Sequence, residues 1–196
     1  YCDRADARRR RAARSVLDTL FDCLTAWLAP ITCFTAEEAW IARHPGKDES
    51  VHVRLFPEIP LTWRNDALAA RWHHIRQMRR VITGILEVER AGKRIGSSLE
   101  AHAEVYADAR YLDALDGIDL AEVAITSGIT IGQGEAPADA FTLDEVPGVA
   151  VAIGPAGGHK CDRCWRVLED VGDDPELPEV CGRCADAVKV HLATNA

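Results

Sequence analysis

The chain has 196 residues, of which 47% are hydrophobic and 28% charged, and its formal net charge is -8. This length allows one domain with a sizeable core and a small appendage, or two modest domains. The longest apolar stretches fall far short of the ~20 residues that span a bilayer, so a membrane span within this sequence is excluded. The chain begins at Tyr1 without a signal sequence, which predicts a piece of a longer protein that is not secreted.

The charge is unevenly distributed along the chain. Residues 1–100 contain 17 Lys and Arg against 13 Asp and Glu, whereas residues 101–196 contain 6 against 18. Between Tyr111 and His159 there are eight acidic residues and neither Lys nor Arg. A polyanion would avoid that segment, so a nucleic-acid partner is restricted to the N-terminal half or to the C-terminal end.

The N-terminal half has helical periodicity. Apolar residues three and four positions apart predict a long amphipathic helix over residues 3–28. A capping box at residues 35–38 predicts a second, shorter helix. Asn65 or Asp66 is expected to cap a third helix that runs to Gly92. The matching apolar faces of the three helices indicate a bundle.

The segments outside these helices lack helical periodicity and have mostly strand and turn patterns. Alternating residues at 51–55 predict an extended segment strapped across the helices. Beyond the third helix, Ser97 and Glu100 are expected to satisfy the backbone of a turn. A brief helix is expected at residues 109–115, and Gly154–Gly158 is expected to be a hinge. Alternation also predicts short strands at residues 101–107, 123–131, 140–146 and 149–153.

Together these patterns predict an α+β fold. It consists of an N-terminal helical bundle, a small β-rich junction region and a C-terminal four-cysteine module. The predicted domains are residues 1–96, residues 97–154 and residues 155–196.

The four-cysteine module is the strongest signal, with the spacing Cys161-x2-Cys164-x16-Cys181-x2-Cys184. Each pair can offer two thiolates to one tetrahedral ion, so the module predicts one structural zinc. Rubredoxin-like iron or a pair of disulfides are the alternatives. Two redox motifs would need a thioredoxin-like strand and helix around each pair, a context that the sequence lacks. Four thiolates leave no open position for water, so no catalytic residue is assigned and the metal is expected to hold shape.

Basic residues surround this module, namely Lys160, Arg163, Arg166 and Arg183. They could compensate the formal charge of about -2 that four thiolates leave on one divalent cation, or they could contact phosphate groups. Both interpretations stay open. For Trp165, packing over the metal loop is favoured, and stacking on a nucleic-acid base is the alternative.

Further motifs occur in a fixed order along the chain. Leu-Ala-Pro-Ile at residues 28–31 and Phe-Thr-Ala-Glu-Glu-Ala-Trp at residues 34–40 are followed by the helix from Trp72 to Gly92. Ile-Gly-Ser-Ser-Leu-Glu-Ala at residues 95–101 then precedes the Lys160–Cys184 module. The first two motifs are similar to anticodon-binding domains of class I aminoacyl-tRNA synthetases. The whole series resembles the C-terminal region of the bacterial isoleucyl-tRNA synthetase family.

This resemblance implies a function for the parent protein and for the chain. The parent would be a monomeric, cytoplasmic ligase that attaches isoleucine to tRNA(Ile) with ATP. ATP and Mg²⁺ would bind only in a catalytic domain that this chain lacks, so the chain alone would be non-catalytic. Its partners would be the rest of the synthetase chain and the anticodon stem-loop side of tRNA(Ile). Candidate tRNA contacts are Lys160, Arg163, Trp165, Arg166, Arg183, Arg76, Arg79, Arg80, Lys93 and Arg94.

Two alternatives are kept. A zinc-containing, DNA-binding module of the formamidopyrimidine-glycosylase type has the same cysteine spacing. Such enzymes use an N-terminal proline and a neighbouring glutamate, whereas this chain begins Tyr1-Cys2-Asp3. The other alternative is a structural zinc module that binds a protein, which the acidic segment at residues 111–159 would suit.

Overall fold

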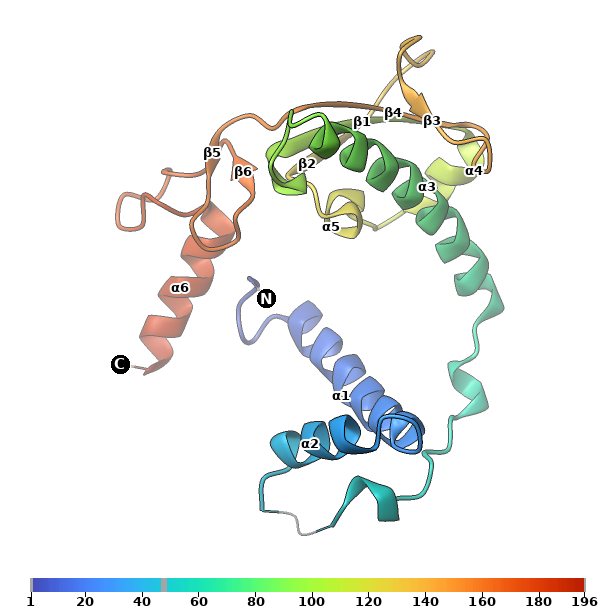
Figure 1. The fold of residues 1–196 in the computed structure, drawn as a ribbon. Coiled ribbons are helices and arrows are strands. Elements are labelled where there is room, and N and C mark those ends of the chain that lie inside the picture. Colours follow the sequence, from blue (N-terminus) through green and yellow to red (C-terminus); the bar gives the residue numbers. More distant parts are fainter. Residues whose placement is uncertain (1, 47–48, 196) are drawn as a thin grey trace. The chain divides into compact units, whose positions relative to one another are not determined.

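The computed structural model describes residues 2–46 and 49–195 (Figure 1). Tyr1, the first residue of the first predicted domain, and Ala196, the last residue of the third, lie outside the described residues. The chain forms two compact units, Asp3–Arg64 and Asn65–Ala196, with Cys2 grouped with the second. The predicted domain boundaries near residues 96 and 154 both lie inside the second unit. Within the described ranges, no helix has the length and apolar character needed to cross a membrane.

The first unit is built on two helices, α1 (Arg8–Leu28) and α2 (Cys33–Arg43). Its small core contains the buried residues Ala29, Ala36, Trp40 and Val51. Helix α2 begins at Cys33, so the capping box predicted at residues 35–38 is wrong because those residues lie inside the helix.

The segment at residues 51–55, predicted to be extended, begins instead as the 3-10 helix η1 (Val51–Val53), and a second one, η2 (Leu61–Trp63), follows it. The cause lies at Ser50, whose Oγ accepts from the His52 amide at 3.2 Å. Glu37 on α2 accepts from both the Ser50 hydroxyl and the Val51 amide, at 2.9 and 2.8 Å. These bonds wind the backbone and bury Val51 against the helix pair.

The second unit begins with α3 (Asp66–Ala91). Its N-terminal cap is confirmed, since Asn65 Oδ1 accepts from the Leu68 amide at 2.9 Å. The apolar stripe of α3 lies against a β-sheet rather than completing the predicted three-helix bundle (Figure 1). Its buried members are Ile75, Met78, Val81, Ile82 and Leu86.

Four strands form the sheet in the order β2-β1-β4-β3. The strands are β1 (Ala101–Ala107), β2 (Gly128–Ile131), β3 (Phe141–Thr142) and β4 (Val149–Pro155). β1 pairs parallel with β2 and antiparallel with β4, and β3 pairs antiparallel with β4. Every second residue of β1 from Ala101 to Val105 is buried with α3 in one core, as alternation on a half-covered sheet requires.

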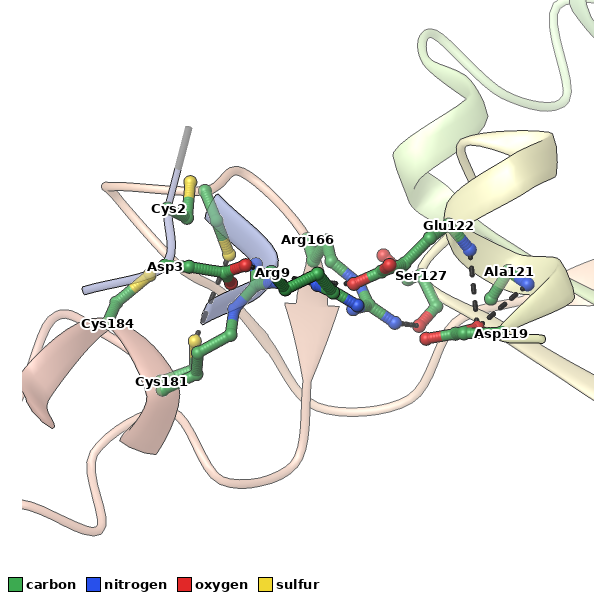
Figure 2. Close-up of polar contacts among 12 residues, drawn as sticks. Cys2, Asp3, Arg9, Asp119, Ala121, Glu122, Ser127, Arg166, Cys181 and Cys184 are labelled. Carbon is green, nitrogen blue, oxygen red and sulfur yellow. Dashed lines mark hydrogen bonds and ion pairs between the residues drawn. The ribbon is translucent and has the colours of Figure 1, made fainter. Parts of the chain in front are cut away.

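Three short helices connect β1 to its parallel neighbour β2, namely α4 (Ala109–Leu112), the 3-10 helix η4 (Asp113–Leu115) and α5 (Leu120–Ala124). The predicted strand at 123–131 is therefore too long. Asp119 Oδ1 accepts from the amides of Ala121 and Glu122, at 2.9 and 3.3 Å, and so begins α5, whose last two residues occupy the start of the expected strand (Figure 2).

The turn before β1 agrees with the sequence. It contains the 3-10 helix η3 (Ser98–Glu100), and Ser97 Oγ accepts from the Leu99 amide at 3.3 Å. Glu100 Oε2 accepts from the Gly96 amide at 2.8 Å. Both side chains thus satisfy backbone groups, as predicted.

The cysteine module follows β4 and contains β5 (His159–Lys160), β6 (Val167–Leu168) and α6 (Gly182–Asn195). Its connection to the sheet is not a free hinge. The Ala156 amide donates to the Glu100 carbonyl at 2.8 Å. Gly158 has φ +100°, and a Cβ there would lie 2.2 Å from the Leu168 carbonyl oxygen, so only glycine fits this close approach.

We expect the α3–sheet core to dominate the stability of the second unit. Val81 on α3 is 0% exposed, whereas Val88 on the same helix is 46% exposed. Val81→Ala should lower the free energy of unfolding by about 2 kcal/mol, because it removes buried methyl groups and leaves a cavity. Val88→Ala should change it by less than about 0.5 kcal/mol. Urea denaturation followed by circular dichroism measures both, and equal losses would contradict the assignment of the core.

Candidate metal centre

The four cysteines predicted as ligands come together in the structure. The Sγ atoms of Cys161, Cys164, Cys181 and Cys184 all lie within 4.8 Å of one another, and all four are free thiols. Cys164 Sγ and Cys181 Sγ are 3.8 Å apart. A tetrahedral site with zinc–sulfur distances of ~2.3 Å has sulfur–sulfur edges of ~3.8 Å, so this donor set fits zinc. The cluster supports one structural zinc held by these four residues.

The first cysteine pair lies at the tip of the β5–β6 hairpin. The Cys161 amide donates to the Arg166 carbonyl at 2.9 Å, and the Trp165 amide donates back to the Cys161 carbonyl at 2.8 Å. These two bonds close the turn and hold Cys161 and Cys164 on one side of it.

The second pair lies at the start of α6. Helix N-termini carry partial positive charge and expose amide groups, which favours thiolates over thiols. The Cys181 amide in addition donates to Cys161 Sγ at 3.3 Å, linking the two pairs. Asp170 caps this helix end by accepting from the Gly182 amide at 3.0 Å.

The pKa values of Cys161, Cys181 and Cys184 are shifted in different directions. Burial opposes ionisation of Cys161, but backbone amide donors around it outweigh burial and lower its pKa to about 6. Burial raises the pKa of Cys181, and burial together with neighbouring thiols raises that of Cys184. A divalent metal favours the thiolate form of all four ligands, so its binding is expected to release protons.

Two of the arginines beside the site face the sulfur atoms. Arg163 Nη1 donates to Cys184 Sγ at 3.5 Å, and this contact raises the pKa of Arg163. Burial lowers the pKa of Arg183, but its contact with Cys164 outweighs burial and raises it. These contacts favour the charge-compensation interpretation for both arginines.

Arg183 and Arg166 also contact the rest of the second unit. Arg183 Nη1 lies 3.5 Å from Glu122 Oε1 on α5. Arg166 Nη2 donates to the Ser127 carbonyl at 2.6 Å (Figure 2). Neither Glu122 nor Ser127 was singled out from the sequence, because each is a common residue type with no motif around it.

Two members of the predicted set remain on the outer surface of the module, Lys160 and Trp165. The Trp165 side chain is 63% exposed, so the favoured interpretation that it packs over the metal loop is wrong. Its φ of +66° is in the left-handed region, which is unfavourable for a bulky residue. An exposed ring held in a strained backbone conformation is more typical of a binding residue than of a packing residue.

The predicted contacts on α3 and in the turn after it, Arg76, Arg79, Arg80, Lys93 and Arg94, are all exposed. Some already have partners. Arg79 Nε donates to the Val123 carbonyl at 2.9 Å, and Arg94 Nη2 donates to Glu89 at 2.7 Å. Arg80 lies 3.8 Å from Glu145, a distance typical of a weak surface pair.

We expect one zinc ion per chain, which Cys181→Ser should abolish because an alcohol replaces one of four thiolates. Cys33→Ser is the matched control, since Cys33 is an exposed thiol on α2 outside the cluster. Elemental analysis of the purified chain measures the metal, and circular dichroism should show that α1 to α3 persist. Bound iron, or zinc retained by Cys181→Ser, would overturn the assignment.

Comparison with known proteins gives two family matches. The family described as the anticodon-binding domain of tRNA ligase matches residues 1–106. The family described as the zinc finger found in FPG and IleRS matches residues 158–187. The first match covers more than half of the chain, and the second covers the metal centre.

Curated relatives point the same way. The chain is 54% identical over 190 residues to the isoleucine–tRNA ligase of Agrobacterium fabrum. The aligned residues cover 96% of this chain and 20% of that protein. It is 51% identical over 195 residues to the isoleucine–tRNA ligase of Mesorhizobium japonicum, covering 97% of this chain and 19% of the relative. The chain thus spans about a fifth of the length of these relatives. It belongs to the family of anticodon-binding domains of tRNA ligases, and it carries the zinc finger found in FPG and IleRS.

Proposed function

We propose that the chain is the tRNA-binding, C-terminal region of an isoleucine–tRNA ligase, and that it recognises tRNA(Ile) from the anticodon side. The observation that carries this proposal is Trp165, an exposed ring presented by a closed metal site in a chain of this family. Exposed aromatic rings bind unstacked bases of single-stranded RNA loops, and an anticodon loop offers such bases.

Within the zinc module, Lys160 and Trp165 are the residues best placed for RNA. Lys160 is exposed on β5 and Trp165 is exposed in the turn after it. Lys160 would contact a phosphate while Trp165 stacks on a base. Arg163, Arg166 and Arg183 have partners inside the second unit, so their contribution to RNA binding would come mainly from long-range attraction.

A second group of contacts is proposed on α3 and in the turn after it. Arg76, Arg80 and Lys93 are exposed and would meet phosphate groups, which position an RNA without reading its sequence. Arg79 and Arg94 keep donor groups beyond those used in their contacts with Val123 and Glu89. They would contribute less.

The parent protein is proposed to be a cytoplasmic, monomeric ligase of which this chain is one part. ATP, Mg²⁺ and isoleucine would bind elsewhere in that longer protein. The chain would supply anticodon-side recognition and would catalyse no reaction itself. The rest of the ligase chain would be its second partner.

The two alternatives are not favoured. The zinc-finger family includes glycosylases, but the match of residues 1–106 to a tRNA-ligase domain does not fit a glycosylase. A protein-binding zinc module would leave both that match and the identity to isoleucine–tRNA ligases without explanation.

We expect the zinc-loaded chain to bind tRNA(Ile), or its anticodon stem-loop, more tightly than an unrelated tRNA, and to bind less tightly as salt rises. Lys160→Ala should lower the magnitude of the log–log salt slope by about one, because one phosphate contact is lost. Lys189→Ala is the matched control, since Lys189 is held by Asp174 and Glu176 at 2.6 and 3.0 Å. Fluorescence titration at several salt concentrations measures the slopes. Equal affinity for both tRNAs, or no binding at low salt, would contradict the proposal.

We expect Trp165→Gly to weaken tRNA binding about tenfold or more, because base stacking on an aromatic ring is lost. Glycine tolerates the φ of +66°, so this variant should keep its zinc and its fold. Trp165→Phe keeps a ring and should retain most of the affinity. Titration of both variants, with zinc content measured on the same samples, separates the ring from the metal site. Unchanged affinity of Trp165→Gly would exclude a stacking role.

A further inference from the structure

Ser127 links the zinc module to the sheet. It lies between α5 and β2 and is 3% exposed. Its amide donates to the Ala101 carbonyl at 3.2 Å, and its hydroxyl donates to the Leu99 carbonyl. It therefore has two bonds to the segment that enters β1, before any contact with the zinc module is counted.

The same residue receives two hydrogen bonds from the zinc module. Ser127 Oγ accepts from the Val167 amide at 2.7 Å. The Ser127 carbonyl accepts from Arg166 Nη2 at 2.6 Å (Figure 2). One small residue thus uses its amide, its carbonyl and its hydroxyl to hold three chain segments together. A hydroxyl can donate one bond and accept others at the same time, which Ala cannot do.

These bonds lie directly beside the proposed RNA-binding residue. Arg166 and Val167 immediately follow Trp165 in the sequence. On the other side, the Trp165 backbone is fixed by the hydrogen bond that its amide donates to the Cys161 carbonyl. The direction of the Trp165 ring relative to the sheet therefore depends on Ser127 at one end and on the cysteine pair at the other.

Two further contacts join the module to the rest of the second unit, the Arg183–Glu122 pair and the bond from the Ala156 amide to the Glu100 carbonyl. The Arg183–Glu122 pair is partly exposed, and such surface pairs contribute little. The bond from the Ala156 amide to the Glu100 carbonyl fixes only the start of the connection. Ser127, by contrast, is buried, and an unsatisfied group there would be costly.

We propose that Ser127 is a positioning residue, which docks the zinc module on the sheet and so sets the orientation in which Trp165 meets RNA. The RNA part of this inference rests on the function proposed above. The docking part concerns only this chain and can be tested without RNA.

The docking test uses the zinc-loaded chain and Ser127→Ala. Loss of the acceptor for the Val167 amide should raise hydrogen exchange at that amide about tenfold or more. Residual dipolar couplings from the sheet and from the zinc module should fit one alignment tensor in the unchanged chain and two different tensors in the variant. Thr194→Ala is the control, because its hydroxyl donates to the Val190 carbonyl within its own helix, away from Ser127. Arg166→Gln, which removes the other bond to Ser127, provides a second variant should Ser127→Ala fold poorly.

The RNA test is a double-mutant cycle. If Ser127 acts by orienting Trp165, Ser127→Ala should weaken tRNA binding about threefold to tenfold with zinc content unchanged, and it should add almost nothing in a chain that already carries Trp165→Gly. Additive losses would show a general structural role and would overturn the positioning proposal, as would unchanged exchange and a single alignment tensor in Ser127→Ala. If the unchanged chain bound no tRNA, the proposed function would fail, while exchange and couplings would still decide the docking role.

Discussion

The electrostatic demand of four sulfur ligands determines how the zinc module is arranged. Four thiolates on one divalent cation leave a formal charge of about -2 in a small, poorly hydrated volume. Three groups offset this negative charge: Arg163 beside Cys184, Arg183 beside Cys164, and the N-terminal end of α6 at the second cysteine pair. Arg163 and Arg183, which the sequence alone offers as phosphate contacts, therefore face the sulfur atoms. Among the five predicted contact residues of the module, only Lys160 and Trp165 are exposed.

Features that depend on neighbouring residues could be predicted from the sequence. The four ligands follow from spacing alone, because two Cys-x-x-Cys pairs suffice to define a tetrahedral donor set. The start of α3 at Asn65 and the backbone bonds of Ser97 and Glu100 are also local, since each joins groups at most four residues apart. The resemblance to isoleucyl-tRNA synthetases likewise rested on contiguous motifs, and the family matches agree with it.

Features that depend on distant residues could not be predicted. The winding of residues 51–53 requires Glu37, which belongs to the preceding helix. The apolar stripe of α3 predicts that this face is buried but not what covers it, and the covering element is a sheet rather than the two preceding helices. Trp165 is exposed and has a left-handed backbone conformation, which a tryptophan in the sequence does not indicate. The docking of the zinc module through Ser127 joins residues about 40 positions apart and has no sequence signature.

The pairing of β1 with β4 gives the Ser127 contacts a mechanical consequence. Because the strands are antiparallel, Ala101 at the start of β1 faces Pro155 at the end of β4. The segments that lead to α3 and to the zinc module therefore leave the sheet at the same end. Tension between them would peel the two strands apart one pair at a time, the loading direction that a β-ladder resists least. Ser127 binds Ala101, Arg166 and Val167 at this end, so these bonds hold the zinc module to the sheet beside the first pair of the ladder, in parallel with the connecting chain.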